Sequence, residues 1–172
     1  MSKPKSVEEI LVQAKKQEME YEWLATTELY EKALELLSEQ SFLKKGEIYE
    51  QLSHACFRAA FQGESVHEFA ERMCQAAATY EKAKESYAYD VESRRTPRAL
   101  RCEAMIAYAN YWRTSEVHDK MRFLDDCWRL TKESLKAFLE AGDNLSYGKT
   151  FNQLCTSAGL EGYFDWDWQR AR

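Results

Sequence analysis

The chain has 172 residues, which suits a single domain able to bury roughly 70% of its unfolded surface. It contains only 6 Gly and 2 Pro residues, too few for the turns of an all-β or doubly wound fold. The net charge of −5 argues against a nucleic-acid-binding groove, which needs clustered Lys and Arg.

Helix-forming residues and their apolar spacing predict seven helices. Each carries apolar side chains three or four positions apart, as in Trp23, Tyr30 and Leu37 of the second helix. The expected ranges are about 7–18, 20–39, 43–62, 66–90, 97–113, 118–140 and 146–158. The chain is therefore predicted to be all-α.

Residues typical of helix ends mark these boundaries. N-cap positions are expected at Ser6, Ser65, Thr96 and Ser115. Ser65 forms a capping-box sequence with Glu68, and Pro97 suits a first helical turn. Helix stops are expected near Gly63, Gly142 and Gly159.

Similar segments recur along the chain. Tyr30-Glu31-Lys32-Ala33 returns 50 residues later as Tyr80-Glu81-Lys82-Ala83, and a weaker copy contains Trp128. Tyr49-Glu50-Gln51-Leu52-Ser53 likewise resembles Phe151-Asn152-Gln153-Leu154-Cys155. Such periods indicate stacked supersecondary units. Tyr30, Tyr80 and Trp128 are predicted to be equivalent core residues.

The segment Tyr30–Leu36 resembles the second helix of a tetratricopeptide repeat. That family spaces small, aromatic and small residues by four and then three positions, as in Thr26-Tyr30-Ala33, Ala76-Tyr80-Ala83 and the drifted Leu124-Trp128-Thr131. The resemblance covers about 20–158 and implies a right-handed solenoid of about three antiparallel helix pairs plus a seventh helix. The 50-residue period exceeds the family's 34, so the long pairs are also similar to soluble NSF attachment proteins.

The resemblance implies that alternate helices line a groove for a peptide or partner protein. Nine polar residues are candidates for this groove: Glu47, Glu50, His54, Arg58, Glu103, Asn110, Arg113, Lys149 and Asn152. A one-residue slip in the helix at 97–113 is equally defensible, and an ordinary solvated face is the alternative. The family's pattern for clamping a terminal carboxylate is missing. The expected function is a non-catalytic protein-interaction scaffold.

One basic concentration stands out in the acidic chain. It consists of Arg94, Arg95, Arg98 and Arg101. Arginine forks grip carboxylate or phosphate groups, so these residues form a candidate anion site. The alternative is pairing with nearby acids such as Glu92 or Glu103. With an anion site, the chain would be a regulatory or sensory module within a larger signalling protein.

Patterns that suggest catalysis or metal binding are incomplete. Glu64-x-x-His67 resembles half of a di-iron motif, but no second copy accompanies it. Cys56 and His54 lie two positions apart, so on a helix their side chains point in different directions. We therefore expect neither an enzyme nor a metal or other cofactor.

Cysteine usage and the start of the chain indicate a cytoplasmic protein. The 5 cysteines include no Cys-x-x-Cys pair, which fits buried thiols in a reducing compartment. The opening MSKPKSVEEI is charged where a signal peptide is apolar, and no segment reaches the length of a membrane span.

Residues 162–172 differ from the rest of the chain in composition. The expected helical domain covers 1–161, and 162–172 holds Tyr163, Phe164, Trp166 and Trp168 between acidic residues. So many aromatic rings close together would form an exposed apolar patch, so we expect them to be buried against another surface. Three alternatives remain open: a cap on the seventh helix, contact with a following repeat, or a homodimer interface at the C-terminal end.

Overall fold

The computed structural model describes residues 6–89 and 96–153, and all regular structure in these ranges is α-helical. Six helices are α1 (Val7–Met19), α2 (Trp23–Glu35), α3 (Phe42–Ala60), α4 (Val66–Ala88), α5 (Pro97–Arg113) and α6 (Val117–Glu140). A further helix covers 144–153, where the described part of the chain ends. The predicted all-α class is confirmed. None of the helices in the described ranges is long and apolar enough to cross a membrane.

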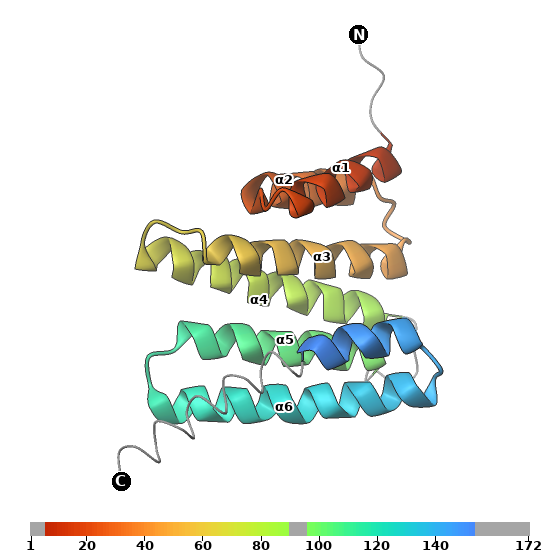
Figure 1. Cartoon of the computed structure of the whole chain (residues 1–172). Helices are drawn as coiled ribbons and strands as arrows, with labels where there is room; N and C mark the ends of the chain where they lie inside the picture. The colour runs from red at the N-terminus through yellow and green to blue at the C-terminus, as the bar shows by residue number, and fades with distance from the viewer. Residues whose placement is uncertain (1–5, 90–95, 154–172) are drawn as a thin grey trace.

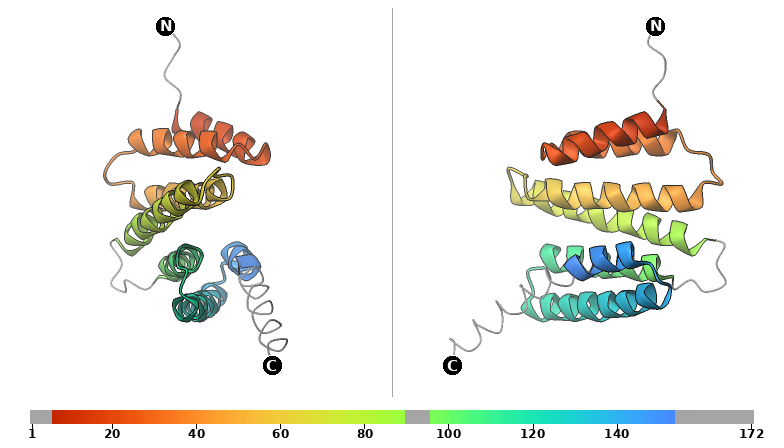
Figure 2. Two further views of the ribbon diagram at one scale, coloured as in Figure 1. Left: turned by 90° about the vertical axis from the view of Figure 1, so that its left-hand side faces the viewer. Right: turned by 45° about the vertical axis from the view of Figure 1, so that its right-hand side comes forward.

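Successive helices pack against one another in chain order, from α1 to α6. Figure 1 shows α1 and α2 at one end of the molecule, α3 and α4 in the middle, and α5 above α6. The helix at 144–153 lies beside α5, as the two views of Figure 2 show. Helices from different layers can therefore share one side of the molecule.

Three of the four expected N-caps are confirmed. The Ser6 hydroxyl accepts from the Glu9 amide at 3.2 Å, and the Glu9 carboxylate accepts from the Ser6 amide at 2.8 Å. Ser65 accepts from the amide three positions on, at 3.1 Å. Thr96 does the same at 3.1 Å, with Pro97 as the first helical residue. Each cap satisfies an otherwise unpaired amide of the first turn.

The expected cap at Ser115 is wrong. Helix α6 begins at Val117, and its N-cap residue, Glu116, makes no side-chain capping hydrogen bond. The Glu116 amide instead lies 3.4 Å from the Thr114 hydroxyl, which accepts its hydrogen bond. A serine before an apolar run is therefore not sufficient to fix the start of a helix.

Two helices also differ from their expected ranges. Helix α2 starts at Trp23 and not at 20, because Tyr21 adopts a left-handed φ of 60° in the turn after α1, and it ends at Glu35 and not at 39. The last helix starts at 144 and not at 146, because the Asp143 carboxylate accepts from the Ser146 amide at 3.0 Å. Gly142, with φ of 71°, provides the left-handed turn after α6, as expected.

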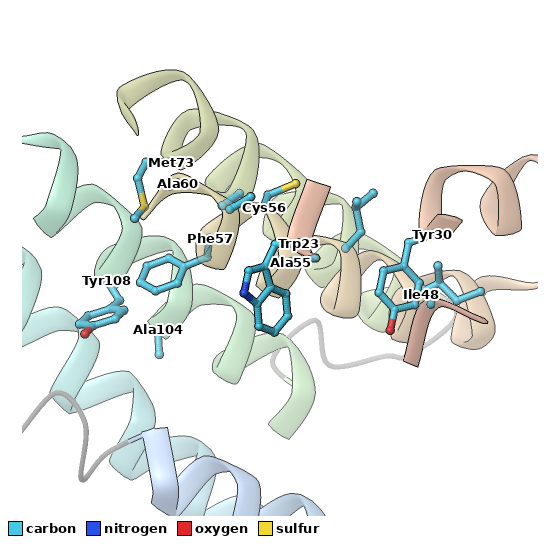
Figure 3. Close-up of a cluster of buried hydrophobic side chains, with 14 of the residues drawn as sticks. Trp23, Tyr30, Ile48, Ala55, Cys56, Phe57, Ala60, Met73, Ala104 and Tyr108 are labelled. Atoms are coloured by element: carbon cyan, nitrogen blue, oxygen red, sulfur yellow. The ribbon is translucent and has the colours of Figure 1, made fainter. Parts of the chain in front are cut away.

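The core joins side chains from α1 to α6. Figure 3 shows part of it, with Trp23 from α2, Phe57 from α3 and Tyr108 from α5 in one cluster. Tyr30 and Tyr80 are buried, with 0% and 2% of their surface exposed, as predicted for equivalent positions. Trp128 is only half-buried, because α6 forms the edge of the described stack.

The expected tail at 162–172 and the end of the seventh helix lie outside the described residues.

Candidate functional site

A cavity of about 980 Å³ is lined by residues from four helices and from the last helical segment. We call it the main cavity. Its walls come from the end of α1, one face of α3, the outer ends of Tyr80 and Tyr87 on α4, one face of α5, and residues 143–153. The α3 lining consists of Glu47, Glu50, Gln51, His54, Phe57, Arg58 and Phe61.

These α3 residues recur every three or four positions, so they occupy one face of the helix. From Glu47 to Phe61 that face extends for about 21 Å at the α-helical rise. The side chains therefore present a long strip that changes from acidic to aromatic along α3. The main cavity follows this strip.

Contacts between α3 and α5 keep a constant spacing. Arg98 pairs with Glu47 at 2.9 Å and Arg101 with Glu50 at 2.6 Å, and both pairs join residues 51 positions apart. The same separation joins two pairs of rings further along: Phe57 with Tyr108 at 5.4 Å and Phe61 with Trp112 at 5.2 Å. The two helices therefore run side by side in the same direction.

The charged end of the main cavity is formed by Glu47, Glu50, Tyr87, Arg98 and Arg101. The Arg101 side chain is 9% exposed, and its Nη2 donates to Oε2 of Glu50 at 2.7 Å and lies 2.6 Å from Oε1. The Tyr87 hydroxyl donates to the same carboxylate at 2.8 Å. Burial opposes the charge on Arg101, but Glu50 outweighs it, so the pKa of Arg101 is raised.

Two nitrogens of Arg101 remain unpaired at this end. Nε and Nη1 are buried and have no hydrogen-bond partner among the described residues. The guanidinium also lies over the ring of Phe138, 5.4 Å from its centre. Unsatisfied donors of this kind cost free energy, and a bound water or ligand group would relieve it.

Gly46 makes room for Tyr87. A Cβ at position 46 would lie 2.8 Å from Cε1 of the Tyr87 ring, closer than carbon atoms approach. Gly46 stands one helical turn before Glu50, so the ring can cross α3 there and place its hydroxyl on that carboxylate. A glycine inside a helix costs about 1 kcal/mol relative to alanine, and here it permits this contact.

The aromatic end of the main cavity is formed by Phe57, Phe61, Met105 and Tyr108. The Phe57 and Tyr108 rings are stacked, and Figure 3 shows them as neighbours. Phe61 is 50% exposed even though it contacts the rings of Phe69 and Trp112. An apolar surface is therefore open to the cavity at this end.

His54 and Arg58 lie between the two ends. The His54 ring meets Trp23 edge-on at 5.7 Å, and the Arg58 guanidinium lies 5.4 Å above the same indole. The His54 side chain is exposed to the cavity, but the surrounding protein partly desolvates it, and this desolvation lowers its pKa. His54 is therefore neutral near pH 7.

Six of the nine candidate groove residues line the main cavity: Glu47, Glu50, His54, Arg58, Lys149 and Asn152. Glu103 and Asn110 line a different hollow of about 300 Å³ between α4, α5 and α6. Arg113 donates to Asn110 at 2.9 Å. The face of α5 that reaches the main cavity carries Arg98, Arg101, Met105 and Tyr108 instead.

The expected basic cluster is divided by the structure. Arg94 and Arg95 lie outside the described residues. Arg98 and Arg101 do line the cavity, but each is already paired with a glutamate of α3. Neither of these partners is Glu103, and Glu92 lies outside the described residues. A partner about 50 positions away could not be chosen from sequence without knowing how the helices stack.

His67 and Cys56, which were considered for metal binding and catalysis, are not among the residues that line the main cavity. His67 is exposed and lies 3.8 Å from Glu71. Burial raises the pKa of Cys56 to about 12, so its thiol is protonated at neutral pH. The described ranges hold no group of three or more His, Cys, Asp or Glu side chains arranged to bind a metal ion.

The main cavity thus offers ion-pairing groups, rings and hydrogen-bonding side chains along one strip. This combination suits non-covalent binding of a ligand with both charged and apolar parts. Comparison of the chain with protein-family models, curated proteins and solved structures gives no match.

Proposed function

We propose that this chain is a non-catalytic protein-interaction module that holds a segment of a partner polypeptide in the main cavity. The observation that carries the proposal is the strip on α3, about 21 Å long by helical rise, which lines the cavity and changes from acidic to aromatic along its length. About six residues of extended chain match this length at roughly 3.3 Å per residue. The cavity volume is also near the upper limit for small-molecule sites, about 1,000 Å³.

We further propose that the helices form a right-handed, tetratricopeptide-like stack. Both complete small–aromatic–small triples are buried: Thr26, Tyr30 and Ala33, then Ala76, Tyr80 and Ala83. The constant 51-residue spacing between α3 and α5 supports the same view, since equivalent helices of adjacent repeats lie side by side.

Site-specific photo-cross-linking tests the binding function. A photoreactive amino acid replaces His54 inside the main cavity and, in a control protein, Lys136, which is 77% exposed on α6. We expect a partner polypeptide from native lysate to be captured from position 54 and not from position 136. Equal capture at both positions, or none from either, would contradict the proposed function.

A small anionic ligand is the second candidate. The unpaired Nε and Nη1 of Arg101 favour it, whereas the pairing of Arg98 and Arg101 with glutamates opposes it. A folded-state ligand raises the melting temperature, so a thermal-shift series with phosphate, sulfate and citrate tests this candidate. Stabilisation that is lost in Arg101→Met would favour the anion.

A cytoplasmic location is part of the proposal. Cys56, Cys74 and Cys102 are free thiols, and thiols persist in reducing compartments.

A further inference from the structure

We infer that the segment held in the main cavity is acidic and carries a large apolar side chain beside its carboxylates. The inference rests on the proposed function and adds the chemistry of the partner. Side-chain carboxylates of the partner would meet Arg58 and Lys149, and its apolar side chain would meet the aromatic end. The charges that already have partners inside the cavity lead to this conclusion.

Every acidic side chain that lines the main cavity in the described part of the chain is already engaged. Glu18 accepts from Lys15 at 2.8 Å and from the Tyr30 hydroxyl at 2.6 Å. Glu47 and Glu50 hold the two arginines of the charged end. Asp143 accepts from the Ser146 amide at 3.0 Å, at the start of the last helix. A cationic ligand would have to compete with these bonds.

Two basic side chains of the lining are not engaged in this way. Arg58 and Lys149 make no ion pair with any residue in the described ranges, and both are exposed to the cavity. They stand on different walls, Arg58 on α3 and Lys149 on the helix at 144–153. A segment lying between these walls can place carboxylates toward both. The neutral His54 beside Arg58 adds a hydrogen-bonding group without adding charge.

The apolar requirement comes from Phe61. This ring is 50% exposed and follows Arg58 by three positions, about 4.5 Å along the helix axis. A ligand carboxylate at Arg58 therefore places a neighbouring side chain over Phe61, where Met105 and Tyr108 extend the apolar surface. Burying a large side chain there adds affinity, while the carboxylates add selectivity for acidic segments.

The inference can be tested with three synthetic peptides of about twelve residues, a length that covers the cavity twice over at roughly 3.3 Å per residue. One contains Asp and Glu beside Phe and Leu. In the second Lys replaces each acid, and in the third Ser replaces each Phe and Leu. All are acetylated and amidated, so that only side chains carry charge. Their affinity for the full chain is measured by fluorescence anisotropy.

We expect the acidic, aromatic peptide to bind most tightly. Arg58→Glu and Lys149→Glu should each weaken it roughly tenfold or more, because attraction becomes like-charge repulsion. Phe61→Ala should weaken it, whereas Lys136→Glu, on the outer surface of α6, should leave it unchanged. Each variant's melting temperature shows that loss of binding is not loss of folding.

Three results would overturn the inference: tighter binding of the Lys peptide, charge reversals without effect, or self-association in sedimentation that Arg58→Glu abolishes. The last would place a second copy of the chain in the cavity. Failure of the proposed function is distinguishable, because then no peptide binds and no cross-link forms from position 54. A basic or uncharged peptide cross-linked from position 54 would refute only the acidic chemistry.

Discussion

The charged end and the aromatic end of the main cavity connect the same two helices at the same 51-residue spacing by different means. At the charged end, two Arg–Glu pairs cross from α5 to α3, and Arg101 is almost fully buried. At the aromatic end, stacked and edge-on rings make the connection, and Phe61 stays half exposed.

Under the proposed function, this difference assigns support of the fold to the charged end and partner binding to the aromatic end. A buried ion pair requires both members and one geometry, since removing either leaves an uncompensated charge. Ring contacts tolerate changes of angle and leave surface available to a ligand. We therefore expect substitutions at the charged end to act mainly on stability, and substitutions at the aromatic end to act mainly on binding.

Replacing Tyr80 by Ala should have the largest effect. This side chain lies behind the charged end and is 2% exposed. Its loss leaves a cavity between layers, with a cost of about 3–5 kcal/mol in the free energy of unfolding. Urea denaturation measures the change, and Tyr80→Phe, which keeps the ring, should cost much less. A loss below about 1 kcal/mol would place Tyr80 outside the core.

Replacing Arg101 by Met should come next, at about 2–3 kcal/mol. The Glu50 carboxylate would then keep only the Tyr87 hydroxyl as a partner. The cost stays below the range for fully buried pairs because the Glu50 side chain is 21% exposed. The matched control is Arg98→Met, whose pair with Glu47 is more exposed and should contribute under about 1 kcal/mol. Equal losses in the two variants would contradict the burial difference.

Replacing Phe61 by Ala should destabilise the fold by only about 1–2 kcal/mol, since half of this ring is already exposed. Its larger consequence should be weaker binding of the acidic, aromatic peptide. Thermal melting and anisotropy on the same sample separate the two effects. A stability loss as large as that of Tyr80→Ala would show that the aromatic end also supports the fold.

The smallest expected effect is a pH dependence from His54. Desolvation lowers its folded pKa, so the unfolded chain takes up a proton first, near the usual value of about 6.5. The folded state should lose stability as the pH falls from about 6.5 through the lowered pKa. His54→Gln should remove this part of the profile. Chemical denaturation at a series of pH values for both proteins would reveal it, and parallel profiles would contradict it.

Local sequence signals were enough for much of the helical structure. Ser6, Ser65 and Thr96 each cap a helix through a side-chain oxygen that is close in sequence. The start of α2 could not be predicted in the same way. Its preceding turn depends on Tyr21 in a left-handed conformation, which a bulky side chain adopts only when surrounding contacts compensate.

The site was partly predictable, because α3 carries a clear periodic face. Four of the predicted groove residues on α3 line the main cavity: Glu47, Glu50, His54 and Arg58. On α5 two faces were equally polar, and the face with Glu103 and Asn110 turned toward a different hollow. The partners of Arg98 and Arg101 are set by the stacking of layers, for which short sequence windows carry no signal.

The close approach of Gly46 to Tyr87 has a consequence for how such a sequence can change over evolutionary time. A Cβ at position 46 would lie 2.8 Å from the ring, so an alanine there requires either a shift of the Tyr87 side chain or a smaller residue at position 87. That second change would remove the hydroxyl from Glu50 and expose the carboxylate. The two positions should therefore co-vary among descendants of this chain, with glycine and tyrosine kept or lost together.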